Sequence, residues 1–121
     1  MTRLRGLVEV RRETVDPSEM PASVDHYSIP ALDATGSPEH VESSMIDSHK
    51  ILLRGGEILV SRLNPRKPRV HAIPSQLSRV SVCSTEFVSL EPRRVDPRYL
   101  RYLLLSEHTR QHLDSHVRSA T

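Results

Sequence analysis

Short strand-like segments bounded by glycine or proline recur along this chain as far as about residue 92, and they constrain its fold more than any other feature. The clearest segment spans residues 57–63 and follows a Gly55-Gly56 turn. Segments of this kind between glycine or proline boundaries are typical of half-buried strands. We therefore expect a domain built mainly on short strands.

The period changes at Asp96-Pro97, where an aspartate that can cap a helix precedes a proline suited to the first helical position. Beyond it, the apolar residues that fall on one helical face are Tyr99, Leu100, Leu103 and Leu104. Strands first and helices last predict the α+β class, with a small mixed or antiparallel sheet and C-terminal helices.

The remaining elements follow from the same signals. Further strands are expected at residues 7–12 (an edge strand), 24–29 (ended by Pro30), 70–73, 79–82 and 85–90 (ended by Pro92), and a second helical segment at residues 106–117. Residues 14–23 have turn composition. Residues 31–48 are polar and show neither the helical nor the strand period, so they are expected to form a long surface loop.

The composition fits a single domain over residues 1–121. Hydrophobic residues make up 36% of the chain and aromatic residues 3%, and Phe87 is the one phenylalanine. The core must therefore be built from leucine, valine and isoleucine, which predicts a modest domain that depends on a partner. No apolar run approaches the roughly 18–20 residues needed to cross a bilayer. The N-terminus lacks the apolar region of a signal peptide, so a cytoplasmic protein is expected.

Charge is distributed unevenly, although the net charge is only +2. Residues 1–49 carry four basic and nine acidic side chains, a net of −5, whereas residues 50–110 carry twelve basic and five acidic ones, a net of +7. Of the 17 basic residues only Lys50 and Lys67 are lysine. Arginine favours bidentate contacts with phosphate or guanine, which predicts a basic face for a polyanion unless folding mixes the two halves. A coding bias toward arginine is the competing explanation.

The densest basic segment is the loop between two predicted strands. Arg62, Arg66, Lys67 and Arg69 fall within eight positions, and prolines at 65 and 68 restrict the backbone between them. A restricted loop loses less entropy on binding, so these cations can meet phosphates in a fixed geometry. Asn64 has a side chain that pairs with adenine, or else it bonds its own backbone in the turn. The alternative is a solvated loop tethered by its prolines.

A second polar cluster comprises Ser81, Ser84, Thr85 and Glu86. Hydroxyl groups at the start of a strand can donate to phosphate, and a carboxylate can accept from the amino group of cytosine. The alternative is a hydrogen-bonded turn that leads into a half-buried strand, with Phe87 facing the core.

The single cysteine, Cys83, excludes an internal disulfide and a four-thiolate zinc site. Neither an oxyanion-hole glycine nor a family signature accompanies it, so we interpret it as a small half-buried thiol. His108, His112 and His116 recur at spacings of four. Adjacent members could share a zinc ion, but a polar face that titrates near neutral pH is the preferred interpretation.

Several phrases of the sequence occur together in one known family. In chain order they are Tyr27-Ser28-Ile29-Pro30-Ala31, Ser48-His49-Lys50, residues 56–65, Pro68-Arg69-Val70 and Cys83-Ser84-Thr85-Glu86-Phe87. In this order they resemble the target-recognition domain of the DNA specificity subunit of type I restriction-modification systems. Residues 96–105 resemble the helix that usually follows, and the resemblance covers residues 27–121.

The resemblance implies a non-catalytic domain that recognises one half of a split double-stranded DNA site. It implies a methyltransferase subunit and a restriction subunit as partners, and those subunits, not this chain, would bind S-adenosylmethionine and ATP. With one recognition domain and no long heptad-patterned helix, the chain resembles a single truncated domain. The expected DNA-binding residues are Arg62, Arg66, Lys67 and Arg69 for phosphate, followed by Asn64 and Lys50.

Two other classes of function stay open. A protein-interaction module that pairs with itself or with restriction subunits is supported by the sparse aromatic core and by the apolar face of Leu100, Leu103 and Leu104. A homo-oligomer would then form, and its stability would depend on concentration. A small metal- or thiol-dependent enzyme would need tight zinc binding or a reactive Cys83.

Overall fold

The computed structural model of the chain describes residues 8–61 and 69–105. Within these residues the strands are β1 (Val8–Arg11), β2 (Thr14–Val15), β3 (Ser23–Tyr27), β4 (Glu39–Glu42), β5 (Lys50–Leu53), β6 (Ile58–Ser61), β7 (Val70–Ala72), β8 (Ser81–Cys83) and β9 (Phe87–Pro92). The helices are α1 (Ile29–Thr35) and α2 (Pro97–Leu105), and single 3-10 turns form η1 (Pro17–Glu19) and η2 (Ser43–Met45).

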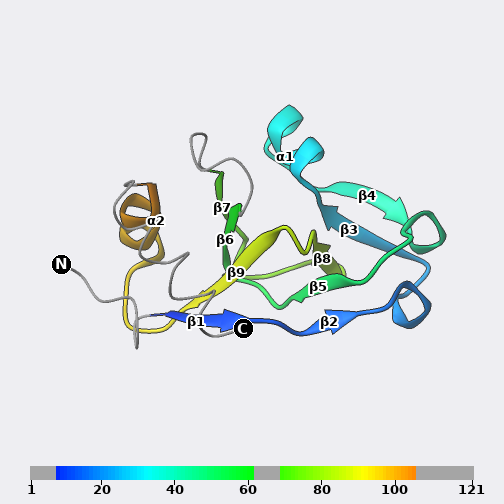
Figure 1. Cartoon of the computed structure of the whole chain (residues 1–121), viewed down its shortest axis with the longest axis horizontal. Helices are drawn as coiled ribbons and strands as arrows, with labels where there is room; N and C mark the ends of the chain where they lie inside the picture. Colours follow the sequence, from blue (N-terminus) through cyan, green and yellow to red (C-terminus); the bar gives the residue numbers. More distant parts are fainter. Residues whose placement is uncertain (1–7, 62–68, 106–121) are drawn as a thin grey trace.

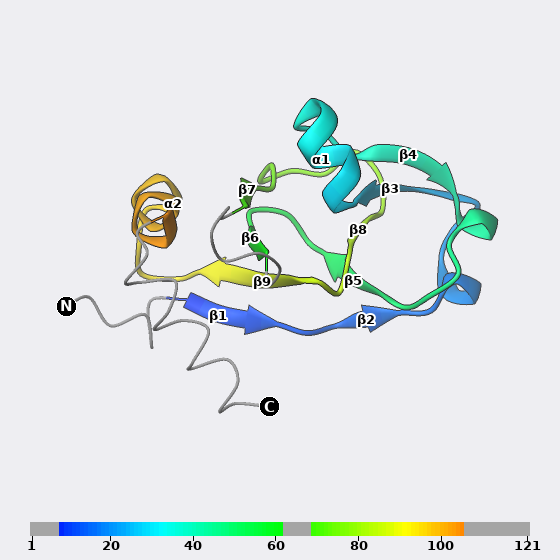
Figure 2. The same ribbon diagram turned by 45° about the horizontal axis from the view of Figure 1, so that its top comes forward.

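The strands form two sheets, and the chain passes from one to the other between β1 and β2 (Figure 1). The first sheet has the order β1-β9-β6-β7 and is antiparallel. The second has the order β2-β5-β8-β3-β4 and is mixed, because β3 and β8 are parallel. Figure 2 shows β1 and β2 lying end to end along one side of the molecule. The predicted α+β class is confirmed, and the predicted edge strand at residues 7–12 is β1.

One hydrophobic core joins the two sheets. Leu59 and Phe87 from the first sheet form a single buried cluster with Tyr27, Ile51 and Cys83 from the second. Phe87 has no exposed surface, which confirms its predicted position in the core. Alternate residues of one strand point to opposite faces, so the remaining apolar residues of β6 and β9 must be covered from the other side.

Helix α2 provides that cover. Its residues Leu100 and Leu104 are fully buried against the outer face of the first sheet, which presents Ile58, Val60 and Leu90. The predicted helical face is wrong at Tyr99, which is 52% exposed. The side chain of Leu103 and the predicted second helical segment lie outside the described residues. No helix in the described part of the chain is long and apolar enough to cross a membrane.

The start of α2 agrees with the sequence. The Asp96 Oδ1 accepts a hydrogen bond of 2.8 Å from the Arg98 backbone N–H. The Asp96 carbonyl oxygen accepts from Leu100 N–H at 2.9 Å. Both bonds are those of an N-cap residue, so the predicted role of Asp96 is confirmed.

The predicted long loop at residues 31–48 is wrong, because this segment contains most of α1 together with β4 and η2. Pro30 does not end a strand but occupies the first turn of α1, where an N–H group is not needed. Ser28 caps the helix by accepting from Ala31 N–H at 3.1 Å, and Gly36 ends it with a φ of 74°. The helix is short and fully buries only Leu32, so it has no visible apolar period.

Two further strands also carry weak sequence signals. β5 reads as a continuous apolar run at Ile51-Leu52-Leu53 because both faces of the second sheet are covered there. β2 lies within the segment of turn composition, as does η1, where Asp16 and Glu19 form a capping box.

The predicted Gly55-Gly56 turn is confirmed, with φ values of 108° and 83°. Glu57 was predicted as a strand residue, but it closes this turn. Its carboxylate is buried and accepts from the N–H groups of Arg54 (2.6 Å) and Gly55 (2.7 Å). The turn joins β5 to β6 and thereby fixes where β6, and the basic segment that follows it, leave the sheet.

Candidate nucleic-acid interface

The predicted basic loop connects β6 to β7. Ser61 N–H donates to the carbonyl oxygen of Arg69 at 2.9 Å, so the two ends of the connection are held side by side. Arg62, Asn64, Arg66 and Lys67 lie outside the described residues, and their assignment to DNA stays a prediction. The described structure therefore defines the base of this hairpin and its surroundings.

Arg69, at the base of the hairpin, is bound to helix α1. Its Nε donates to both carboxylate oxygens of Asp33, at 2.9 and 3.1 Å. The hydrogen bond that Arg69 donates to Asp33 raises the pKa of Arg69, so this guanidinium stays charged. Both bonds use Nε, which leaves the two terminal nitrogens of Arg69 to donate elsewhere.

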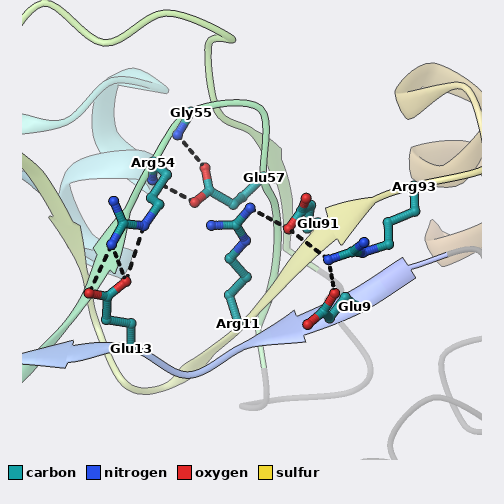
Figure 3. Close-up of polar contacts among 8 residues, drawn as sticks. All are labelled: Glu9, Arg11, Glu13, Arg54, Gly55, Glu57, Glu91 and Arg93. Carbon is teal, nitrogen blue, oxygen red and sulfur yellow. Dashed lines mark hydrogen bonds and ion pairs between the residues drawn. The ribbon is translucent and has the colours of Figure 1, made fainter.

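Folding mixes the acidic and basic halves of the chain. Four arginines from residues 50–110 pair with carboxylates from residues 1–49: Arg54 with Glu13 (2.7 Å), Arg69 with Asp33 (2.9 Å), Arg79 with Asp25 (3.8 Å), and Arg93 with Glu9. Figure 3 shows two of these pairs, together with Arg11 bound to Glu91. Much of the uneven charge is thus neutralised by ion pairs within the described part of the domain.

A small set of basic side chains has no carboxylate partner from another element among the described residues. Arg98 contacts only Asp96 of its own helix start, at 3.5 Å, and its side chain is 93% exposed. The unpaired side chains are Arg12, Lys50, Arg94 and Arg101. Three of these five arginine and lysine residues, counting Arg98, belong to α2 or to the turn before it.

Lys50 begins β5 and lies in an acidic part of the surface. It lines a shallow depression together with His26, Glu39, Glu42 and Asp47. Burial lowers the pKa of His26, and the charge of Lys50 lowers it further. Three carboxylates around one ammonium group oppose a phosphate, so Lys50 is the weakest of the predicted DNA contacts.

The second polar cluster forms a turn. The Ser84 Oγ accepts from Glu86 N–H at 3.1 Å, and Phe87 N–H donates to the Ser84 carbonyl oxygen at 3.1 Å. Ser81 is only 1% exposed and donates to the Arg79 carbonyl oxygen at 3.1 Å. For the two serines, the alternative of a hydrogen-bonded turn is therefore correct. Thr85 and Glu86 are exposed.

Beside the hairpin, the fold brings helix α2 onto β6 and β7, an arrangement that the sequence does not predict. His71 of β7 has its ring edge against Phe87. Burial lowers the pKa of His71, and the charges of Arg101 and Arg69 lower it further, whereas the charge of Asp33 raises it. One feature of the sequence could have identified Arg101: it is a polar residue next to the buried positions Leu100 and Leu104 in the helical pattern.

Cys83 is not suited to nucleophilic chemistry. It has no exposed surface, and burial raises its pKa to about 12. A thiol in this environment stays protonated at neutral pH, and it is buried more deeply than the half-buried thiol predicted. Within the described residues no group of three or more histidine, cysteine or acidic side chains is placed to hold a metal ion. His108, His112 and His116 lie outside those residues.

The described residues thus define a two-sheet α+β domain with arginines on a helix and at the base of a neighbouring hairpin. Its fold matches a chain in a solved structure described as the structural basis of complex assembly and conformational transition of the type I R-M system. The TM-score is 0.68 and the sequence identity 23%, and the match covers 84% of this chain and 28% of that chain. This chain therefore corresponds in fold to less than a third of the other one. Neither a protein-family model nor a curated protein matches the sequence.

Proposed function

We propose that this chain is a target-recognition domain of a type I restriction-modification specificity subunit, which binds double-stranded DNA sequence-specifically and catalyses no reaction. Two independent observations support this proposal. The fold resembles a chain from a type I R-M structure, and the order of the sequence phrases between residues 27 and 105 resembles the same system. The fold match is the observation that carries the proposal. It covers 84% of this chain although the two sequences are only 23% identical.

The proposed DNA contacts centre on the hairpin between β6 and β7. Arg62, Arg66, Lys67 and Arg69 would hold the phosphates, and Asn64 would contact an adenine edge. The base of the hairpin is fixed by the backbone bond between Ser61 and Arg69 and by the ion pair with Asp33. A fixed base limits the entropy lost when the loop binds, which favours a specific register on the duplex. Lys50 is retained as a peripheral contact only.

The same proposal includes the partner subunits and the cytoplasmic location of the chain. Methyltransferase and restriction subunits would bind S-adenosylmethionine and ATP, and this cytoplasmic chain would bind neither. A split DNA site would then be read by this domain over one half only.

The alternative of a protein-interaction module needs a different surface from the one first considered. Leu100 and Leu104 are buried in the core of this domain, so they cannot form a docking face. The exposed apolar residues of α2 are Tyr99, Tyr102 and Leu105. Because these residues could contact another protein, self-association or pairing with restriction subunits is the second candidate function.

The proposal is tested by fluorescence anisotropy with a random-sequence duplex pool across a salt series. The test variant combines Arg66→Ala and Lys67→Ala. The control combines Arg54→Ala and Arg79→Ala, which removes the same charge from exposed residues that pair with Glu13 and Asp25. Loss of two phosphate contacts should reduce the slope of log K against log salt by about 1.8.

The control should retain the slope of the unaltered chain, and the pool can then be used to select the half-site. Absence of binding by the unaltered chain at low salt would contradict the proposal. An equal loss of affinity in both double variants would show attraction by net charge alone and would remove the hairpin from the interface.

A further inference from the structure

Helix α2 has two chemically different faces. Leu100 and Leu104 are buried, whereas Arg98, Tyr102 and Leu105 lie on the opposite side, at 100° per residue around the helix. Tyr102 is 71% exposed. The helix contains no acidic residue from Pro97 to Leu105, so within the described residues its arginines meet one carboxylate only, that of the N-cap Asp96 with Arg98.

The ion pairs of the domain distinguish these arginines from the others. Arg54, Arg79 and Arg93 each contact a carboxylate from the N-terminal half. Arg94 and Arg101 have no such contact within the described residues, and Arg98 has only the 3.5 Å contact to its own N-cap. Arg94, in the turn before the helix, and Arg101 therefore have their hydrogen-bonding capacity available to a partner. Arg98 keeps its two terminal nitrogens for the same purpose, because its contact with Asp96 uses Nε.

This helix lies next to the strands of the hairpin. In Figure 1, α2 stands beside β6 and β7. Arg101 lies on α2, which packs on β7, and Arg69 directly precedes β7 at the base of the hairpin. A duplex held by the hairpin would thus have the arginines of α2 beside it.

We infer that α2 and the turn before it form a second DNA-contact element, in which Arg94, Arg98 and Arg101 bind backbone phosphates and Tyr102 packs against the sugar-phosphate chain. This inference rests on the proposed function and extends it to a surface that the sequence phrases do not include. Nine residues make a helix about 13 Å long, which matches about four base pairs at 3.4 Å per step.

The charge of this surface favours a nucleic acid over a protein as its occupant. A largely apolar protein interface would remove the guanidinium groups of Arg94, Arg98 and Arg101 from water and would add no charge to compensate them. Phosphates supply both the missing charge and acceptors for the planar, multidentate donors of arginine.

The test compares three double variants in the same salt series. Arg98→Gln with Arg101→Gln alters the helix, Arg66→Ala with Lys67→Ala alters the hairpin, and Arg54→Gln with Arg79→Gln serves as the charge-matched control. The helix variant should bind about tenfold or more weakly at roughly 0.1 M salt, with a slope lower by about 1.8. It should unfold at the same urea concentration as the unaltered chain, because neither arginine has a stabilising partner outside its own helix start.

The outcomes separate this inference from the proposed function. If the hairpin variant loses affinity and the helix variant behaves like the control, α2 is not a contact element, although the chain still binds DNA. If the unaltered chain fails to bind DNA, both proposals fail. Tyr102→Ala should weaken DNA binding as well. If it instead abolishes self-association in sedimentation and leaves DNA affinity unchanged, the occupant is a protein and the inference is overturned.

Discussion

At Gly55 the backbone has a φ of 108° and passes beside the carbonyl oxygen of Ser75. A Cβ atom here would lie 2.6 Å from that oxygen, a distance that requires a backbone shift. The turn is also fixed by Glu57, which accepts from two of its N–H groups. Burying this carboxylate is costly, and the two short hydrogen bonds offset that cost.

The neighbouring glycine provides a matched control for a prediction. Gly56 also has a positive φ, but a Cβ atom there would meet nothing within 4 Å. Gly56→Ala should therefore cost only the left-handed backbone penalty of about 1–2 kcal/mol. Gly55→Ala should cost roughly 1–3 kcal/mol more because the clash is with backbone. Urea denaturation measures both variants, and equal costs would show that the approach to Ser75 is not restrictive.

Among the elements, α2 depends on a narrow set of contacts for its position. Leu104 is fully buried, whereas Leu105 is 47% exposed. Leu104→Ala should destabilise the domain by about 2–5 kcal/mol, because it leaves a cavity against the first sheet. Leu105→Ala should stay within about 0.5 kcal/mol. A similar loss at both positions in urea denaturation would contradict the packing of α2 on β6 and β7.

The elements also differ in how far the sequence could predict them. Residues 57–63 carry a strand signal, and the strand is present at Ile58–Ser61, where Ile58, Leu59 and Val60 are all buried. α1 and β4 have no comparable signal: α1 fully buries one residue, and β4 is an edge strand with three exposed residues of four. Their positions are fixed by tertiary contacts, such as the pairing of β4 with β3. Local pattern cannot contain this information.

At the scale of the whole molecule, the same limit applies to the candidate interface. The sequence identified Arg69, but its partner Asp33 lies 36 positions away in a segment predicted as a loop. Twelve basic residues between 50 and 110 look equivalent in the sequence. Only the fold shows that Arg54, Arg79 and Arg93 pair with carboxylates from the other half of the chain. Among the described residues Arg98 contacts only its own N-cap, and Arg101 has no carboxylate partner. Charge counts along a chain therefore overestimate its free basic surface.

Titration of buried histidines affects the stability of both sheets. His26 in β3 and His71 in β7 each have a buried Nε2 with no partner among the described residues. Burial lowers both pKa values from 6.5; Lys50 lowers that of His26 further, and Arg101 and Arg69 do so for His71. The unfolded chain therefore takes up protons first on acidification. Stability that is complete above about pH 6.5 is lost as the pH falls through the lower values of the folded state.

A second loss follows at lower pH, and the two can be separated. Hydrogen bonds from Ser18 and Arg98 lower the pKa values of Asp16 and Asp96 from 3.8, so their contribution is lost only below about pH 4. The urea midpoint, measured from about pH 8 to about pH 3, should fall in these two steps. The variant with His26→Gln and His71→Gln should lose the first step and keep the second. A first step that survives in this variant would assign it to groups other than these two imidazoles.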